Sequence, residues 1–130
     1  MKNLIYILIP FFILSCTDVT QQKEESTLTK NSDSDDITFI IDLKVNPDSL
    51  EDLNLFVEEI TQNVIDNEDF CLEYAYYVTE DKSSVTLYEK YIDSKSAVKH
   101  GQNFMGSPFF ERFFNLFTLE KFIVTGPASE

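Results

Sequence analysis

The chain has 130 residues, which is enough for one domain of ordinary size in addition to a separate N-terminal segment. Hydrophobic residues make up 43% of the chain and aromatic residues 14%, so a packed core is expected. The formal net charge of −13 argues against a nucleic-acid partner, because so acidic a surface repels phosphates.

The first sixteen residues, MKNLIYILIPFFILSC, have the pattern of an export signal. Lys2 precedes an apolar run that is too short to cross a bilayer as a helix. The run ends in Ile13-Leu14-Ser15-Cys16, which resembles the lipobox of bacterial lipoproteins. That resemblance implies that residues 1–15 are removed and that Cys16 is acylated, so that the lipid is the chain's sole contact with the membrane of the cell envelope, facing the periplasm or the cell surface. An ordinary cleaved signal and an uncleaved anchor remain as alternatives.

Residues 17–36 are almost entirely polar, with Val19 and Leu28 as their apolar side chains. Such a segment buries too little apolar surface to offset the entropy of ordering it. Residues 16–36 are therefore predicted to be a lipidated cysteine followed by a flexible acidic tether, and residues 37–130 the folded domain.

The domain begins with a predicted strand and helix. Apolar residues alternate with more polar ones from Ile37 to Val45, which is the period of a half-buried strand. Pro47-Asp48-Ser49 then breaks the strand and supplies residues that favour a helix start. Apolar residues recur at steps of three and four as far as Val64, so an amphipathic helix is predicted to run to about Asp66.

The rest of the domain predicts two strands joined by a polar turn, two helices and a closing strand. The second helix is predicted to start at the cap Asp93-Ser94, and Gly106-Ser107-Pro108 separates it from a short apolar helix. These elements are expected at residues 70–78, 85–92, 95 to about 104, 108–117 and 119–124.

The resulting order of strand, helix, strand, strand, helix and strand predicts an α+β, ferredoxin-like βαββαβ fold. Its antiparallel four-stranded sheet carries the helices on one face. The other face also needs a cover, and a second copy packed sheet against sheet is the expected one. Phe70, Leu72, Tyr74 and Tyr76 share one parity of the second strand and are expected to supply that face.

The stretch LYEKYIDSKSAVKH, residues 87–100, followed by SPFFERF, resembles the antibiotic biosynthesis monooxygenase family of the dimeric α/β barrel superfamily. The resemblance covers roughly residues 37–126. It rests on the element order and on a glutamate and an aromatic residue ending a strand, followed by an alanine and a histidine on the next helix. The matching positions are Glu89, Tyr91, Ser94, Ala97 and His100.

The resemblance implies a homodimer with one pocket in each subunit. The best-known members oxidise quinols or polyaromatic phenols with molecular oxygen and need no metal, flavin or other cofactor. The family therefore implies a cofactor-independent quinol monooxygenase, with His100 as the base because its unperturbed pKa is near neutrality. The expected pocket is lined by Tyr88, Tyr91, Phe104 and Phe109. A structural role for His100, tying the second helix to the strand edge, is the alternative.

Other functions remain open from the sequence. A haem-degrading branch of the superfamily has an asparagine on strand one and a tryptophan on strand three, whereas this chain has Asp42 and Lys44 on strand one and no tryptophan. Haem degradation is therefore disfavoured. A non-catalytic barrel that binds a small hydrophobe or serves in a stress response, and a simple dimerisation module, are the two alternatives. Cys71 is predicted to be a half-buried strand residue rather than a nucleophile, since no histidine or basic residue neighbours it.

Overall fold

The computed structural model describes residues 34–128, so the predicted signal, Cys16 and most of the tether lie outside the described residues. Within that range the chain forms four strands, three α-helices and one 3₁₀ turn. Their order confirms the predicted ferredoxin-like α+β fold. The elements are β1 (Ile37–Val45), η1 (Pro47–Ser49), α1 (Leu53–Asn67), β2 (Cys71–Val78), β3 (Ser84–Tyr91), α2 (Ser94–Met105), α3 (Phe109–Leu116) and β4 (Phe117–Thr125).

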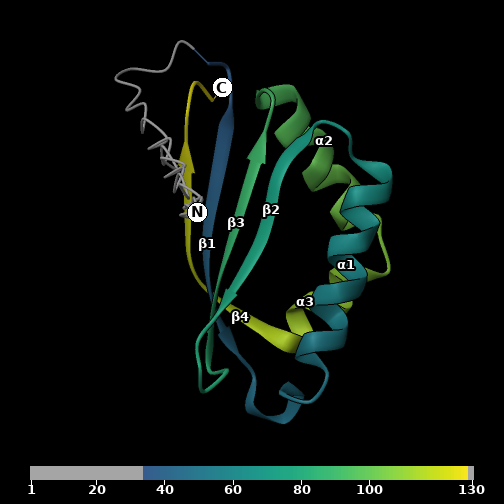
Figure 1. Cartoon of the computed structure of the whole chain (residues 1–130), viewed down its shortest axis with the longest axis vertical. Coiled ribbons are helices and arrows are strands. Elements are labelled where there is room, and N and C mark those ends of the chain that lie inside the picture. The colour runs from purple at the N-terminus through teal and green to yellow at the C-terminus, as the bar shows by residue number, and fades with distance from the viewer. Residues whose placement is uncertain (1–33, 129–130) are drawn as a thin grey trace, which may run out of the picture. The chain divides into compact units, whose positions relative to one another are not determined.

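The four strands form one sheet in the order β2-β3-β1-β4, and every neighbouring pair is antiparallel. The three α-helices lie on the same side of this sheet, as Figure 1 shows. The first and third strands are thus central, and β4 and β2 form the two edges. No helix among residues 34–128 is long and apolar enough to cross a membrane.

Alternation along β3 shows which side of the sheet is covered. Val85, Leu87, Glu89 and Tyr91 are buried, whereas the residues between them are partly exposed. Successive side chains of a strand point to opposite faces, so these four face the helices. Glu89 is the exception in this otherwise apolar row, and a buried carboxyl needs partners.

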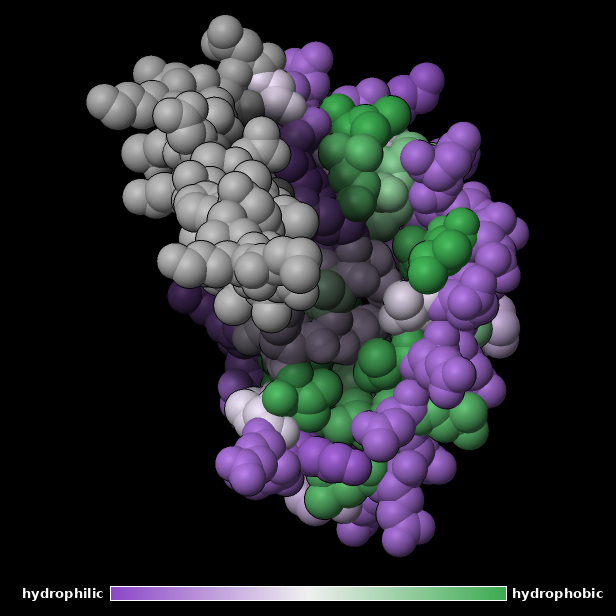
Figure 2. All heavy atoms as spheres, in the orientation of Figure 1, coloured by the Kyte–Doolittle hydropathy of each residue, from purple (hydrophilic) through white to green (hydrophobic). Residues whose placement is uncertain are grey.

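The main core lies between the sheet and the two helices α1 and α3. The first of these helices buries Leu53, Phe56, Ile60 and Val64, which recur at helical spacing on one face. Its opposite face is polar and acidic, and hydrophilic residues dominate the right-hand edge of Figure 2, where Figure 1 places α1. Leu53, Phe56 and Ile60 belong to the main core cluster, whose other buried members are Leu43, Val45, Val85, Leu87, Phe113, Leu116 and Phe117.

Local sequence signals fix the ends of the helices. The side chain of Asp93 accepts a hydrogen bond of 2.7 Å from the backbone N–H of Ser96, so the predicted cap of α2 is confirmed. The predicted break at residues 106–108 separates α2 from α3. The first helix begins later than its sequence suggested, at Leu53, because Pro47–Ser49 form a separate 3₁₀ turn.

The prediction that Phe70, Leu72, Tyr74 and Tyr76 supply the face away from the helices was wrong for all but Leu72, which is exposed. Tyr74 and Tyr76 pair in register with Glu89 and Leu87, and therefore share the face that the helices cover. An irregularity in the pairing between Cys71 and Glu73 shifts the parity of the strand at this point. Phe70 precedes the strand and is buried in a smaller cluster with Ile37, Tyr91 and Ala97.

Candidate functional site

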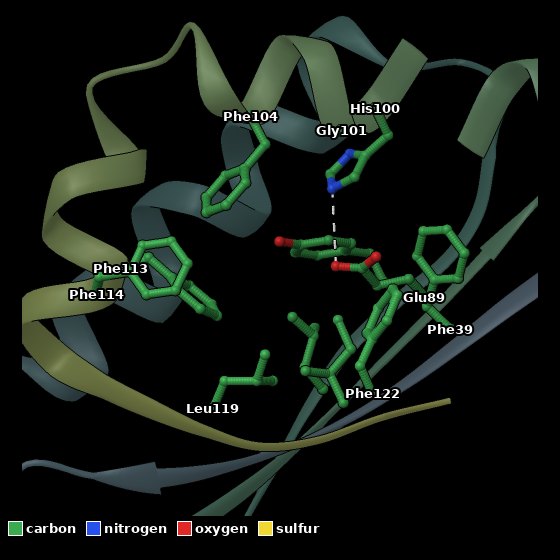
Figure 3. Close-up of a pocket in the computed structure, with 12 residues that line it drawn as sticks. Phe39, Glu89, His100, Gly101, Phe104, Phe113, Phe114, Leu119 and Phe122 are labelled. Atoms are coloured by element: carbon green, nitrogen blue, oxygen red, sulfur yellow. Dashed lines mark ion pairs between the residues drawn. The ribbon is translucent and has the colours of Figure 1, made fainter. Parts of the chain in front are cut away.

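A pocket of about 260 Å³ lies between the helix-covered face of the sheet and the pair α2 and α3. In Figure 3 the rings of Phe104 and His100 project from α2, Phe113 and Phe114 from α3, and the remaining labelled side chains rise mainly from the strands. An engineered cavity of about 150 Å³ holds one benzene, so this volume suits a ligand of about two rings. The lining residues are Phe39, Ile41, Tyr74, Leu87, Glu89, His100, Gly101, Phe104, Phe113, Phe114, Leu119 and Phe122.

His100 lies at the polar end of this pocket. It is about two turns into α2, and Phe104, one turn later, stacks its ring parallel to the imidazole at 6.4 Å between centroids. The Nδ1 atom of His100 is 2.6 Å from Oε2 of Glu68, and Nε2 is 3.7 Å from Oε1 of Glu89. One ring nitrogen is thus held by the residue that follows α1, while the other faces the strand residue that lines the pocket.

All three members of this cluster are buried, with 7% of His100, 6% of Glu68 and 3% of Glu89 exposed. Further hydrogen bonds satisfy both carboxyls. The amide of Asn103 donates to Oε1 of Glu68 at 2.9 Å, and the hydroxyl of Tyr91 donates to Oε2 of Glu89 at 2.8 Å. A buried polar network is stable when its members are all partnered in this way.

Burial is the main cause of the electrostatic shifts in the site. It raises the pKa of Glu89 above the usual value of a glutamate, and the neighbouring His100 and the Tyr91 hydroxyl oppose this rise. Burial likewise raises the pKa values of Tyr74 and Tyr91, so both phenols stay protonated at neutral pH. The raised pKa of Glu89 favours the protonated form of its carboxyl. One protonated imidazole could balance the negative charge of only one of the two buried carboxylates.

Replacing Glu89 with glutamine should therefore reduce the pH dependence of stability. The unfolded chain loses the Glu89 proton at about pH 4.3, whereas the folded chain keeps it to a higher pH. Between these two pKa values, rising pH lowers the free energy of unfolding of the wild type, by at most about 1.4 kcal/mol per pH unit from this group. Above the folded pKa, the difference in the free energy of unfolding between the wild type and Glu89→Gln should no longer change with pH.

Urea unfolding of both proteins between pH 4 and 8 measures this difference. The matched control is Glu120→Gln, which changes an exposed carboxyl on β4 and should leave the pH profile of the wild type unchanged. Parallel profiles for Glu89→Gln and the wild type would contradict a raised pKa at this position.

The structure brings some of the sequence-predicted pocket residues together and leaves others apart. His100 and Phe104 line the pocket. Tyr91 is fully buried and does not line the pocket, but its hydroxyl donates a hydrogen bond to Glu89, which does. Tyr88 pairs with Ile40 and Ala75 on the face away from the helices, and Phe109 packs against Phe56 instead.

Glu68 is the partner of His100 that the sequence did not single out, whereas Tyr74 was a candidate aromatic wall of the pocket and does line it. Glu68 lies 32 residues before the histidine in a run that reads as a polar connector. The ring of Tyr74 lies 5.9 Å from that of His100, and its hydroxyl is 3.2 Å from the hydroxyl of Tyr76.

Cys71 shows no sign of reactivity. Burial raises the pKa of its thiol to about 12, and the nearby carboxyls of Glu89 and Glu68 add to the rise. The thiol therefore stays protonated at neutral pH, which argues against a nucleophile. Within residues 34–128, no group of three or more histidine, cysteine, aspartate or glutamate side chains is arranged to hold a metal ion.

Comparison with solved structures places this fold among known proteins. MupZ from Pseudomonas fluorescens superposes with a TM-score of 0.64 at 17% identity, covering 78% of this chain and 75% of that one. A Nitrosomonas europaea protein provisionally named an antibiotic biosynthesis monooxygenase gives a TM-score of 0.63 at 16% identity, covering 77% of this chain and 100% of the other.

A variant of SnoaB from Streptomyces nogalater, a cofactor-independent oxygenase, also shares the fold. It superposes with a TM-score of 0.58 at 14% identity, covering 75% of this chain and 97% of that one. At such identities the likeness establishes the fold, which is that of proteins named as antibiotic biosynthesis monooxygenases. No protein-family model and no curated protein matches the sequence.

Proposed function

We propose that this protein is a cofactor-independent monooxygenase that oxidises a small quinol or phenol. The observation that carries the proposal is the placement of His100. Its ring lies at the wall of a largely apolar pocket, and the buried carboxyl of Glu68 holds it from the other side at 2.6 Å. A ring nitrogen directed to the pocket side by a buried carboxyl is the arrangement of a general base.

The chemistry requires little beyond this base and the pocket. A hydroxyl of the quinol gives its proton to His100, and the resulting phenolate is electron-rich enough to reduce oxygen. For a naphthohydroquinone the balance is quinol plus O₂ giving hydroxynaphthoquinone plus water, so the substrate supplies all the electrons. The phenylalanine rings that line the pocket orient the aromatic substrate and exclude bulk water.

Glu89 has a second role in this proposal. Its carboxyl lines the pocket beside His100, and its raised pKa favours the protonated form. A protonated carboxyl can donate a hydrogen bond to an oxygen on which negative charge develops. An ionised carboxylate at the same place would repel the phenolate.

Oxygen consumption with menadiol and related quinols tests the proposal. The full-length protein should accelerate oxygen uptake above the spontaneous rate in proportion to its concentration, and the hydroxylated quinone should appear as product. A rate that equals the spontaneous one with every quinol and phenol tried would overturn the monooxygenase proposal.

A non-catalytic carrier of a small hydrophobe is the second candidate, and the apolar lining of the pocket favours it. Menadione, which cannot be oxidised further in the same way, serves as the probe. Binding of menadione without any oxygen uptake on menadiol would support the carrier over the enzyme.

We also propose that the protein is a lipoprotein of the cell envelope, since the first sixteen residues end in a lipobox-like tetrapeptide. Mass spectrometry of the mature N-terminus should find an acylated Cys16 as its first residue. A mature chain that begins at any other residue, or an unmodified Cys16, would contradict the anchor.

The domain is further proposed to form a homodimer through the sheet face that the helices leave uncovered. A row of apolar residues crosses this face in register, from Ala75 through Tyr88 and Ile40 to Ile123. Light scattering on the purified protein at micromolar concentration should give twice the chain mass, and Tyr88→Glu should give the monomer. A monomeric wild type would remove this part of the proposal.

A further inference from the structure

Glu68 holds His100 through a contact that decides which ring nitrogen carries the proton. The carboxyl lies at the C-terminal end of α1, where its backbone N–H caps the helix by bonding to the carbonyl of Val64. Its side chain reaches His100 with one oxygen and Asn103 with the other. Both contacts run from the end of one helix to a single face of α2, since residues 100 and 103 are neighbours on a helix.

The two oxygens of the Glu68 carboxyl have different hydrogen-bond partners. An amide nitrogen can only donate, so the Asn103 amide occupies Oε1 and leaves Oε2 to the imidazole. An ionised carboxylate can only accept, which makes Nδ1 the donor in the 2.6 Å contact. The same ring then has a bare Nε2, and this is the nitrogen on the side of Glu89 and the pocket.

The titratable groups that surround the imidazole support the same assignment. Glu89 and Tyr91 face it from β3, Tyr74 from β2 and Glu68 from the end of α1. Both tyrosines remain protonated, and the Tyr91 hydroxyl already donates to Glu89. Glu68 is therefore the closest acceptor for a ring N–H.

We propose that Glu68 is a positioning residue that fixes His100 in the tautomer with its proton on Nδ1, so that Nε2 accepts the proton of a ligand hydroxyl in the pocket. After that transfer the imidazole carries protons on both nitrogens, and the carboxylate of Glu68 stabilises its positive charge. Asn103 completes the arrangement by holding the carboxylate in place. The consequence for turnover rests on the proposed function, whereas the tautomer itself does not.

A small cavity behind the histidine fits this role. It has a volume of about 20 Å³ and lies on the side of His100 that faces Glu68 and Asn103, with Asn63 and Ser107 also at its wall. That volume accommodates about one water molecule, which these polar groups could bind. The cavity thus gives the Glu68 carboxylate room for a third hydrogen-bond donor.

The single histidine of the chain makes the tautomer directly measurable. In the ¹⁵N spectrum of the full-length protein, a protonated ring nitrogen and a bare one give well-separated signals. The wild type, at a pH where the ring is neutral, should show the proton on Nδ1 and a bare Nε2. A proton on Nε2 in the wild type would overturn the proposal, and this measurement needs no variant protein.

Glu68→Gln provides the second measurement, with Asp69→Asn as its matched control because Asp69 is the exposed carboxyl next in sequence. In Glu68→Gln the preference for Nδ1–H should be lost, and kcat with menadiol should fall at least about tenfold while KM stays within about twofold. Asp69→Asn should match the wild type in both. An unchanged spectrum in a folded Glu68→Gln protein would refute the role of Glu68, whereas a changed spectrum with no oxygen uptake in any protein would leave it standing and refute the monooxygenase.

Discussion

Replacing His100 with asparagine should lower the rate of quinol-dependent oxygen uptake by about 10²- to 10⁴-fold, which is the usual contribution of a general base. The asparagine amide sits near the place of Nδ1 and can still donate to Glu68. It cannot accept a proton at neutral pH, so the variant removes the base while keeping the buried hydrogen bond. Initial rates at saturating menadiol, with the spontaneous rate subtracted, give the comparison.

His100→Ala separates the two roles that the sequence left open. Alanine leaves the buried carboxyl of Glu68 without its 2.6 Å partner, and breaking a buried pair in this way costs about 3–5 kcal/mol. A purely structural histidine predicts that His100→Ala destabilises the fold and that His100→Asn keeps full turnover. A catalytic histidine predicts the loss of turnover in both variants.

Gln102→Asn serves as the control, because it makes a similar change at an exposed position on the same helix. It should keep both the stability and the turnover of the wild type. Full activity of His100→Asn, in a protein that unfolds at the wild-type urea concentration, would exclude His100 as the base.

The fold could be predicted from the sequence because local patterns agree with one another along the whole domain. The period-two alternation of residues 37–45 and the helical spacing from Leu53 to Val64 each match what the structure shows. The cap at Asp93 and the break before Phe109 set the boundaries of α2 and α3. These signals are local, so they do not depend on how distant parts of the chain pack.

The candidate site was less predictable because it depends on which face each strand presents. Tyr88 and Tyr91 are three residues apart on one strand, so their side chains must point to opposite faces, and they could not both line one pocket. That spacing was a usable signal. The second strand offered no such signal, since both of its parities carry tyrosines and the irregularity after Cys71 exchanges them.

The sequence did not predict Glu68 as a site residue for a different reason. It stands in the run Asn67-Glu68-Asp69, which has the composition of a solvated connector. Its burial arises from the packing of the end of α1 against α2, and nothing in the local sequence specifies that contact. The burial of Glu68 and its contact with the one histidine can be recognised only from the folded structure.

Replacing Phe56 with alanine should cost about 3–5 kcal/mol of the free energy of unfolding, the usual range for a buried phenylalanine. Phe56 is fully buried, and its ring contacts the rings of Phe109, Phe113 and Phe117 at 5.9–6.3 Å between centroids. These neighbours belong to α3 and β4, so the one ring joins three elements. Its removal leaves a cavity that rigid surrounding rings fill poorly.

Leu55→Ala is the matched control, because it removes a large apolar side chain from the adjacent position of the same helix, where 54% of the residue is exposed. It should change stability by no more than about 0.5 kcal/mol. Equilibrium urea unfolding of the three proteins gives the comparison. Similar losses in both variants would contradict this contact as the source of the effect, since alanine favours a helix at both positions. A small loss in Phe56→Ala alone would mean that α3 can move to close the cavity. The pocket wall that Phe113 and Phe114 form would then move with it, and binding of the proposed quinol would weaken even though the fold survives.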